Sequence, residues 1–182
     1  PQDVDRMLGL PLLGSIPASA NGDLVDQLLD RKAELSEAYL SVKTSLSFLT
    51  DHGVPKALMM TSIGPNEGKS ISSFALAQIL GRSGQRTVLV DADMRNPSVL
   101  GLLDMKNPMG LSNYLSGQSQ VSEIIVPSGF ENLDLMGAGP HPPNAAELLS
   151  GPRIASLVQE LLERYDHVVI DSPPVLGLAD AP

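Results

Sequence analysis

Residues 61–70 of the chain, with the sequence TSIGPNEGKS, carry side chains that could bind a phosphate group and its cation. Gly68 allows close approach of the backbone, the ammonium of Lys69 can reach the β- and γ-phosphates of a nucleotide, and the Ser70 hydroxyl can bind Mg²⁺. This arrangement is typical of a phosphate-binding loop. Its expected nucleotide contacts are Gly64, Pro65, Asn66, Glu67, Gly68, Lys69, Ser70 and Ile71.

The loop departs from the strict pattern G-x-x-x-x-G-K-[ST], because Ile63 stands where the first glycine is expected. The alternative is a Gly-Pro turn followed by a lysine and a serine in the first turn of a helix. A lysine at a helix N-terminus is unfavourable unless an anion compensates its charge, since the helix dipole is positive there. A bound phosphate is the anion that we expect.

Carboxylates follow two other apolar runs. Asp91 and Asp93 come after TVLV, and Asp171 comes after HVVI. Alternate residues of an extended chain share a face, so we expect Asp91 and Asp93 to point the same way. Two like charges placed together favour a bound cation, and together with Ser70 the three carboxylates are the expected ligands of Mg²⁺. The alternative for Asp91 or Asp93 is a carboxylate that caps a helix.

The elements that must position these residues alternate between strand and helix patterns. Upstream, apolar residues recur with a helical period over residues 23–50, which predicts one long helix or two broken near Asp30. Residues 8–17 predict a loop with one brief strand. Further strands are predicted at residues 56–62, 87–90, 133–136 and 167–170, and further helices at 71–80, 97–103, 111–115, 121–125, 145–149 and 152–165.

Continuous apolar strands that alternate with helices predict an α/β fold: a doubly wound, mainly parallel sheet of the P-loop NTPase type with helices on both faces. Met59 and Met60 are expected in a core strand. The loop and both carboxylate clusters fall at the carboxyl ends of strands, where ligands bind in such sheets. Residues 137–143 either border this site or serve as a connection.

The composition of the chain excludes or disfavours several classes of partner and site. The 182 residues favour one main domain, and the net charge of −9 disfavours nucleic acid as a partner. The chain has no cysteine, which excludes disulfides, thiolate zinc sites and cysteine nucleophiles. No apolar run reaches the roughly 18–20 residues that a membrane helix needs.

Three stretches of the chain resemble the Walker A, A′ and B motifs of bacterial protein-tyrosine kinases. They are residues 62–70, 88–95 and 168–174. The likeness extends to Glu37-Ala38-Tyr39, to residues 110–117 (GLSNYLSG) and to residues 142–149 (PPNAAELL), so it covers nearly the whole chain. It implies a kinase domain at the cytoplasmic face of the inner membrane that uses ATP and Mg²⁺. Such kinases phosphorylate the C-terminal tyrosine tail of their own or a neighbouring subunit. They form homo-oligomers, work with a membrane-spanning polysaccharide co-polymerase, and regulate the chain length, polymerisation and export of capsule or exopolysaccharide.

The resemblance also implies catalytic roles. Lys69 would hold the β- and γ-phosphates, with Asp93 beside it at the magnesium ion. Asp91 would be the base for the tyrosine hydroxyl, which is protonated at neutral pH because its ordinary pKa is about 10. Arg95 would stabilise the charge that develops on the phosphoryl group. The alternative for Arg95 is a surface residue or a helix cap.

The chain differs from the family pattern in three respects, of which the first two concern its arginine and tyrosine positions. The helix that usually carries Glu-x-x-Arg-x-x-Arg for ring formation has Leu40 and Lys43 at the two arginine positions, which removes the bidentate guanidinium contacts. The alternative is that Leu40 simply packs. The tyrosines, Tyr39, Tyr114 and Tyr165, are scattered and form no tail.

We expect the chain to be an excised fragment. Residues 9–17 resemble the stretch that joins such a kinase to its membrane half, so we assign residues 1–22 to an N-terminal juxtamembrane-type segment. Residues 23–182 are expected to form the kinase domain, without the strands that should follow Asp171. Two other functions stay open. One is a P-loop ATPase of the partition and division-site type, although its signature lysine is missing from residues 62–64. The other is an ATP-sensing regulatory module of a polysaccharide export complex, without catalysis.

Overall fold

The computed structural model describes residues 9–18 and 23–175, and the chain folds as two compact units, Pro1–Pro55 and Lys56–Pro182. The first unit contains helices α2 (Leu24–Leu29) and α3 (Glu34–Ser47), which pack on each other. The chain breaks between them because Asp30 ends α2 and its carboxylate accepts a 3.0 Å hydrogen bond from the backbone N–H of Lys32. The two-helix form of the prediction is therefore confirmed.

Residues 9–17 form no strand, so this part of the predicted brief strand is wrong. Gly9 has a positive φ of 63°, and the prolines at 11 and 17 lack the N–H that a strand ladder needs. Residues 1–8 and 19–22, which complete the predicted N-terminal segment, lie outside the described residues, as do residues 176–182.

Within the described part of the second unit, the sheet has five strands in the order β1-β5-β2-β4-β3. The pairs β1–β5, β5–β2 and β2–β4 are parallel, which confirms the four predicted strands and the doubly wound α/β class. The fifth strand was missed. This strand, β3, is antiparallel to β4 and begins directly after α7 (Val121–Ile124). Its three residues are too few to show the alternation of a strand. The strands are β1 (Ala57–Met60), β2 (Thr87–Asp91), β3 (Ile125–Pro127), β4 (Leu133–Met136) and β5 (His167–Asp171).

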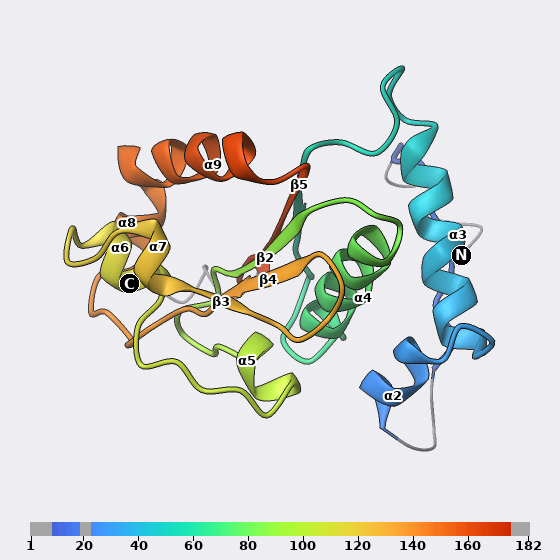
Figure 1. Ribbon diagram of the computed structural model, residues 1–182, viewed down its shortest axis with the longest axis horizontal. Helices are drawn as coiled ribbons and strands as arrows, with labels where there is room; N and C mark the ends of the chain where they lie inside the picture. Colours follow the sequence, from blue (N-terminus) through green and yellow to red (C-terminus); the bar gives the residue numbers. More distant parts are fainter. Residues whose placement is uncertain (1–8, 19–22, 176–182) are drawn as a thin grey trace. The chain divides into compact units, whose positions relative to one another are not determined.

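Helices cover both faces of the sheet, with α4 on one face and α9 on the other (Figure 1). Alternate residues of β2 explain this: Val88 and Val90 join a core with residues of α6, α7 and α9, whereas the equally buried Leu89 lies outside that cluster. The helices are α4 (Lys69–Arg82), α5 (Val99–Leu102), α6 (Leu111–Leu115), α7 (Val121–Ile124), α8 (Ala145–Ser150) and α9 (Pro152–Arg164).

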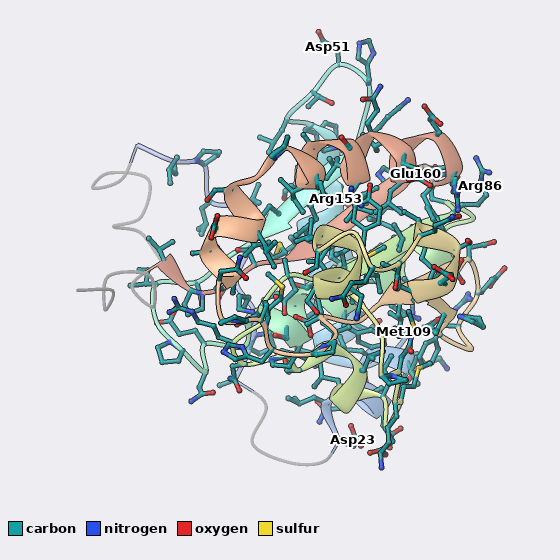
Figure 2. All side chains as sticks on the ribbon, turned by 90° about the vertical axis from the view of Figure 1, so that its left-hand side faces the viewer. Asp23, Asp51, Arg86, Met109, Arg153 and Glu160 are labelled. Carbon is teal, nitrogen blue, oxygen red and sulfur yellow. The ribbon has the colours of Figure 1, made fainter. Side chains whose placement is uncertain are left out.

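Arg153, labelled in Figure 2, ties α9 to α6. Its guanidinium carbon lies 4.8 Å from the ring centroid of Tyr114, and its Nε donates a 3.0 Å hydrogen bond to the Tyr114 carbonyl. The attraction between the cation and the ring stabilises this contact between the two helices.

Strand β1 is an edge strand of the described sheet, and the Met59 side chain is 68% exposed. The expectation that Met59 belongs to the core is therefore wrong, because an apolar run alone does not distinguish a central strand from an edge. No helix in residues 9–18 and 23–175 is long and apolar enough to span a membrane.

The register of the strands places the predicted site at their carboxyl ends, on one side of the sheet. Asp171, the last residue of β5, pairs with Met60 at the end of β1 and with Asp91 at the end of β2. Because these strands are parallel, the loop that follows β1 and both carboxylate clusters leave the sheet on the same side.

Candidate nucleotide-binding site

Residues 61–68 connect β1 to α4 in a loop that closes on itself. The Ser62 hydroxyl donates to the carbonyl of Gly64 at 2.8 Å, and a Glu67 carboxylate oxygen accepts from the Ile63 N–H at 3.0 Å. Gly68 takes the left-handed conformation, with φ of 77°, and directs the chain into α4 without a side-chain cap. The uncapped N–H groups of the first helical turn form the kind of terminus at which anions bind.

Lys69 begins α4, and its ammonium is held by two carboxylates. The Nζ atom lies 3.0 Å from Asp171 Oδ1 and 3.5 Å from Asp93 Oδ2, and it donates to the Ser70 hydroxyl at 3.3 Å. The Lys69 and Asp93 side chains are 9% and 7% exposed, and that of Asp171 is fully buried. The anion expected beside a lysine at this helix terminus is therefore supplied here by the protein itself.

Hydroxyl groups complete the surroundings of Asp171. Ser70 donates to Asp171 Oδ2 at 2.6 Å, and Ser73, one turn further along α4, donates to Oδ1 at 3.0 Å. The Ser98 hydroxyl donates in turn to the Ser70 hydroxyl at 2.7 Å. These bonds form a chain from Ser98 through Ser70 to the carboxylate. Together with the contact between Lys69 and Asp93, they bring together all three stretches identified in the sequence.

Asp91 is buried and bonds to backbone rather than to Lys69. One of its oxygens accepts from the N–H groups of Ser98 and Val99 at 3.0 Å each, and the other from the N–H of Asp93 at 3.1 Å. Asp91 thus takes the helix-capping arrangement, at the start of α5, whereas Asp93 faces Lys69. The two carboxylates thus have different partners, and because β2 ends at Asp91, strand alternation does not extend to Asp93.

Burial raises the pKa of Asp91 to about 6, since desolvation disfavours the charged carboxylate. The three N–H groups pull the pKa down, and the nearby charge of Asp171 pushes it up. Burial is the largest of these effects.

A cavity of about 410 Å³ lies beside Asp91 and Ser98. It is also lined by Lys106, Ala138 and Gly139, so the loop at residues 137–143 borders the site rather than serving only as a connection. The loop is further joined to the site by His141, whose Nδ1 lies 2.7 Å from the carbonyl oxygen of Met94. Arg95 is exposed and lines a separate hollow of about 590 Å³ with His141 and residues 142–147.

The sequence reasoning missed Ser73 and Ser98. Ser98 could have been found as the polar residue that begins the predicted helix at 97–103. Ser73 lies inside an apolar helical stretch, and no local pattern distinguishes it from a helix residue without a functional role.

The oxygen ligands at this site suit an Mg²⁺ ion that is bound together with phosphate. The described residues contain no group of three or more His, Cys, Asp or Glu side chains that could enclose a metal ion. Mg²⁺ usually binds through one or two carboxylates, with water and substrate phosphates as its other ligands. Asp171, Asp93 and the Ser70 hydroxyl form a donor set of that kind, next to a helix terminus suited to phosphate.

Comparison with known proteins agrees with this geometry. Residues 64–181 match the family model described as an AAA domain. The chain is 36% identical over 154 residues to tyrosine-protein kinase YwqD of Bacillus subtilis, a match that covers 85% of this chain and 65% of that protein. It is 37% identical over 145 residues to tyrosine-protein kinase wzc of Salmonella typhimurium, covering 80% of this chain and 20% of that protein.

Among solved structures, the chimerical protein CapA2B2 superposes with a TM-score of 0.85 at 34% identity, over 96% of this chain and 75% of that one. The P-loop NTPase fold expected from the sequence is confirmed. The chain spans less than two thirds of the length of YwqD and a fifth of that of wzc.

Proposed function

The chain belongs to the bacterial tyrosine-protein kinases of the capsule family, and we propose that its site binds ATP with Mg²⁺ and transfers the γ-phosphate to a tyrosine hydroxyl. The observation that carries this proposal is the position of Lys69. Its ammonium stands at the uncapped N-terminus of α4 and contacts two carboxylates, Asp171 at the end of β5 and Asp93 just after β2. This arrangement is what phosphoryl transfer needs, because the reaction depends on positioning and on charge stabilisation.

Lys69 and the loop before it bind the phosphates in this proposal. The backbone N–H groups of Gly64, of residues 66–68 and of the first turn of α4 surround the β-phosphate, and Lys69 contacts the β- and γ-phosphates. Ser70, Asp93 and Asp171 hold Mg²⁺ directly or through water. The metal ion, when bound, neutralises negative charge on the phosphates.

Asp91 is the proposed base for the tyrosine hydroxyl, and it also lies where the metal ion would bind. A carboxyl group with a pKa of about 6 is mainly ionised at neutral pH and is more basic than an ordinary aspartate. Its Oδ2 is bonded to the N–H groups of Ser98 and Val99, so Oδ1, which accepts only from the Asp93 N–H, is the oxygen proposed to take the proton of the hydroxyl. Arg95, exposed on the loop that carries Asp93, stabilises the transferred group.

The acceptor tyrosine lies outside the folded part of this chain. Tyr39 and Tyr114 are buried, with 4% and 8% exposure, and the Tyr165 hydroxyl is bonded to Asp134 at 2.7 Å. We place the acceptor in the C-terminal tail of the full-length protein or of a neighbouring subunit. We further propose that Leu40, an apolar residue 45% exposed on α3, takes part in the subunit contact of a homo-oligomer.

The context of the reaction is also proposed from the relatives. The names of the relatives support a tyrosine kinase. From the family resemblance we propose that it works with a membrane-spanning polysaccharide co-polymerase at the cytoplasmic face of the inner membrane, and the greater length of wzc leaves room for such a part. In this proposal, phosphorylation of the kinase on its own tyrosine tail regulates the chain length and export of capsule or exopolysaccharide.

Phosphotyrosine formation tests the proposal. The full-length protein is incubated with Mg²⁺ and ATP labelled in the γ-phosphate, beside Lys69→Met and the exposed-lysine control Lys56→Met. We expect labelled phosphotyrosine in the unmodified protein and in the control, and none in Lys69→Met. ATP hydrolysis without phosphotyrosine would contradict the kinase and support the ATPase alternative, and binding without either reaction would support the regulatory module.

A further inference from the structure

Ser73 is a buried polar residue that the phosphate-binding motif does not include. It lies four residues after Lys69 in α4, with 0% exposure, at the start of a stretch from Ser73 to Gly81 in which every residue is buried. Burial of a hydroxyl group costs free energy unless the group forms hydrogen bonds. The contacts of Ser73 therefore indicate why a serine stands in this part of the helix.

The Ser73 hydroxyl lies 3.0 Å from two acceptors, the Lys69 carbonyl and Asp171 Oδ1. A bond to the carbonyl four residues earlier is common for serine in helices and would by itself satisfy the hydroxyl. The contact with Asp171 is additional, and it joins residues 98 positions apart in the sequence. A serine hydroxyl has one proton, and a charged carboxylate is the stronger of the two acceptors.

The orientation of the Asp171 carboxylate depends on three side-chain donors. Lys69 and Ser73 donate to Oδ1, and Ser70 donates to Oδ2. Two of these, Lys69 and Ser70, are the proposed ligands of phosphate and Mg²⁺. A lysine ammonium has three N–H donors, and those of Lys69 are directed to Asp171, Asp93 and Ser70. When a Lys69 N–H donates to phosphate, it no longer donates to Asp171, Asp93 or Ser70. The hydrogen bond from Ser73 to Asp171 does not depend on this change.

We propose that Ser73 is a positioning residue that fixes the Asp171 carboxylate, so that Oδ2 stays directed toward Ser70 and the magnesium position after Lys69 has turned to the nucleotide. This inference rests on the proposed function, since it assigns Asp171 to the metal ion. Carboxylates that bind metal ions are commonly held by such hydrogen bonds, and loss of one lowers metal affinity by about 10-fold to 100-fold.

The test compares the Mg²⁺ requirement of nucleotide binding in variants of the full-length protein. Binding of a fluorescent ADP analogue is measured against Mg²⁺ concentration, and separately in EDTA. Ser73→Ala removes the hydroxyl, and Ser73→Cys keeps the volume with a weak donor, so a result is obtained even if the cavity left by alanine impairs folding. The matched control is Ser83→Ala, because Ser83 makes the same kind of bond to a carbonyl four residues earlier, at 2.7 Å, at the far end of α4.

The expected result is a rise of about 10-fold in the Mg²⁺ concentration for half-maximal binding in both Ser73 variants, with unchanged binding in EDTA and an unchanged control. An unchanged Mg²⁺ requirement in Ser73→Cys would overturn the inference. So would an equal loss of binding with and without Mg²⁺, which would reveal a purely structural role. If the unmodified protein bound no nucleotide, the proposed function itself would fail, and this inference with it.

Discussion

The Ser70 hydroxyl donates a 2.6 Å hydrogen bond to Oδ2 of Asp171, although 101 positions separate the two residues. The bond forms because β1 and β5 are parallel neighbours whose ends, Met60 and Asp171, are in register. The loop after β1 then brings Ser70, the second residue of α4, against the end of β5. Two proposed ligands of Mg²⁺, far apart in the sequence, are thus brought together by the register of two parallel strands.

Replacement of Lys69 by methionine should destabilise the nucleotide-free protein. The change leaves the buried carboxylates of Asp93 and Asp171 without their cation, which costs about 3 kcal/mol of unfolding free energy. Urea unfolding at neutral pH measures this loss. The exposed Lys56→Met variant should stay within about 0.5 kcal/mol of the unmodified protein. Equal stability of the two variants would show that the ammonium does not compensate the carboxylates.

Two glycines with positive φ separate backbone strain from ligand binding. Gly68 before α4 and Gly84 after it have φ of 77° and 86°, so alanine at either position should cost about 1 kcal/mol of stability. Only Gly68→Ala should also weaken nucleotide binding, because its added Cβ lies at the phosphate-binding loop. Binding titrations of a fluorescent ADP analogue compare the variants. Equal affinities would argue against close contact between nucleotide and backbone at Gly68.

The raised pKa of Asp91 should make the protein less stable as pH rises from about 4 to 6. In this window the folded state, with a pKa of about 6, holds a proton that the unfolded state, near 3.8, has already lost. The loss amounts to about 3 kcal/mol and is complete above pH 6. A carbon-13 NMR titration of the aspartate carboxyl groups, in EDTA, reads the pKa directly. An Asp91 carboxyl that titrates below pH 4 would contradict the burial argument.

Tyr165 should contribute to stability and not to the reaction. Burial and the bond to Asp134 both raise the pKa of its hydroxyl, so it remains a donor at every pH in use. It lies before β5, at the end of the sheet opposite Asp171. Tyr165→Phe should cost about 1 kcal/mol, as the loss of one hydrogen bond implies, with unchanged phosphotyrosine in the full-length protein. Tyr114→Phe, which keeps the ring beneath Arg153, is the matched control and should cost less. Loss of phosphotyrosine in Tyr165→Phe alone would identify Tyr165 as an acceptor.

Much of the sheet could be predicted because its central strands are continuous apolar runs that end in polar residues. Strand β4 was predicted with its observed bounds, and β2 and β5 were each predicted one residue short, at the aspartate that begins the site. Edge strands carry less information. Met59 is as apolar as its neighbours yet exposed, and Ile125–Pro127 is too short to show a period.

The site was less predictable than the sheet. Spacing brought Lys69, Ser70 and Asp171 together correctly, because each lies at the end of a recognisable element. It did not indicate that Asp91 turns to the start of α5, since that depends on where β2 stops and where the next helix begins. Nor could local sequence reveal Ser73, whose contact with Asp171 depends on how α4 packs against β5.

The central claim is that Lys69 exchanges its carboxylate partners for the phosphates of a nucleotide. A crystal structure of the protein with Mg²⁺ and a non-hydrolysable ATP analogue tests it most directly. We predict that Lys69 Nζ leaves at least one of its present partners, which now lie at 3.0 Å and 3.5 Å, and contacts the terminal phosphates, while Ser70 and Asp171 face the metal ion. A nucleotide bound elsewhere, with Lys69 still bridging Asp93 and Asp171, would contradict the account.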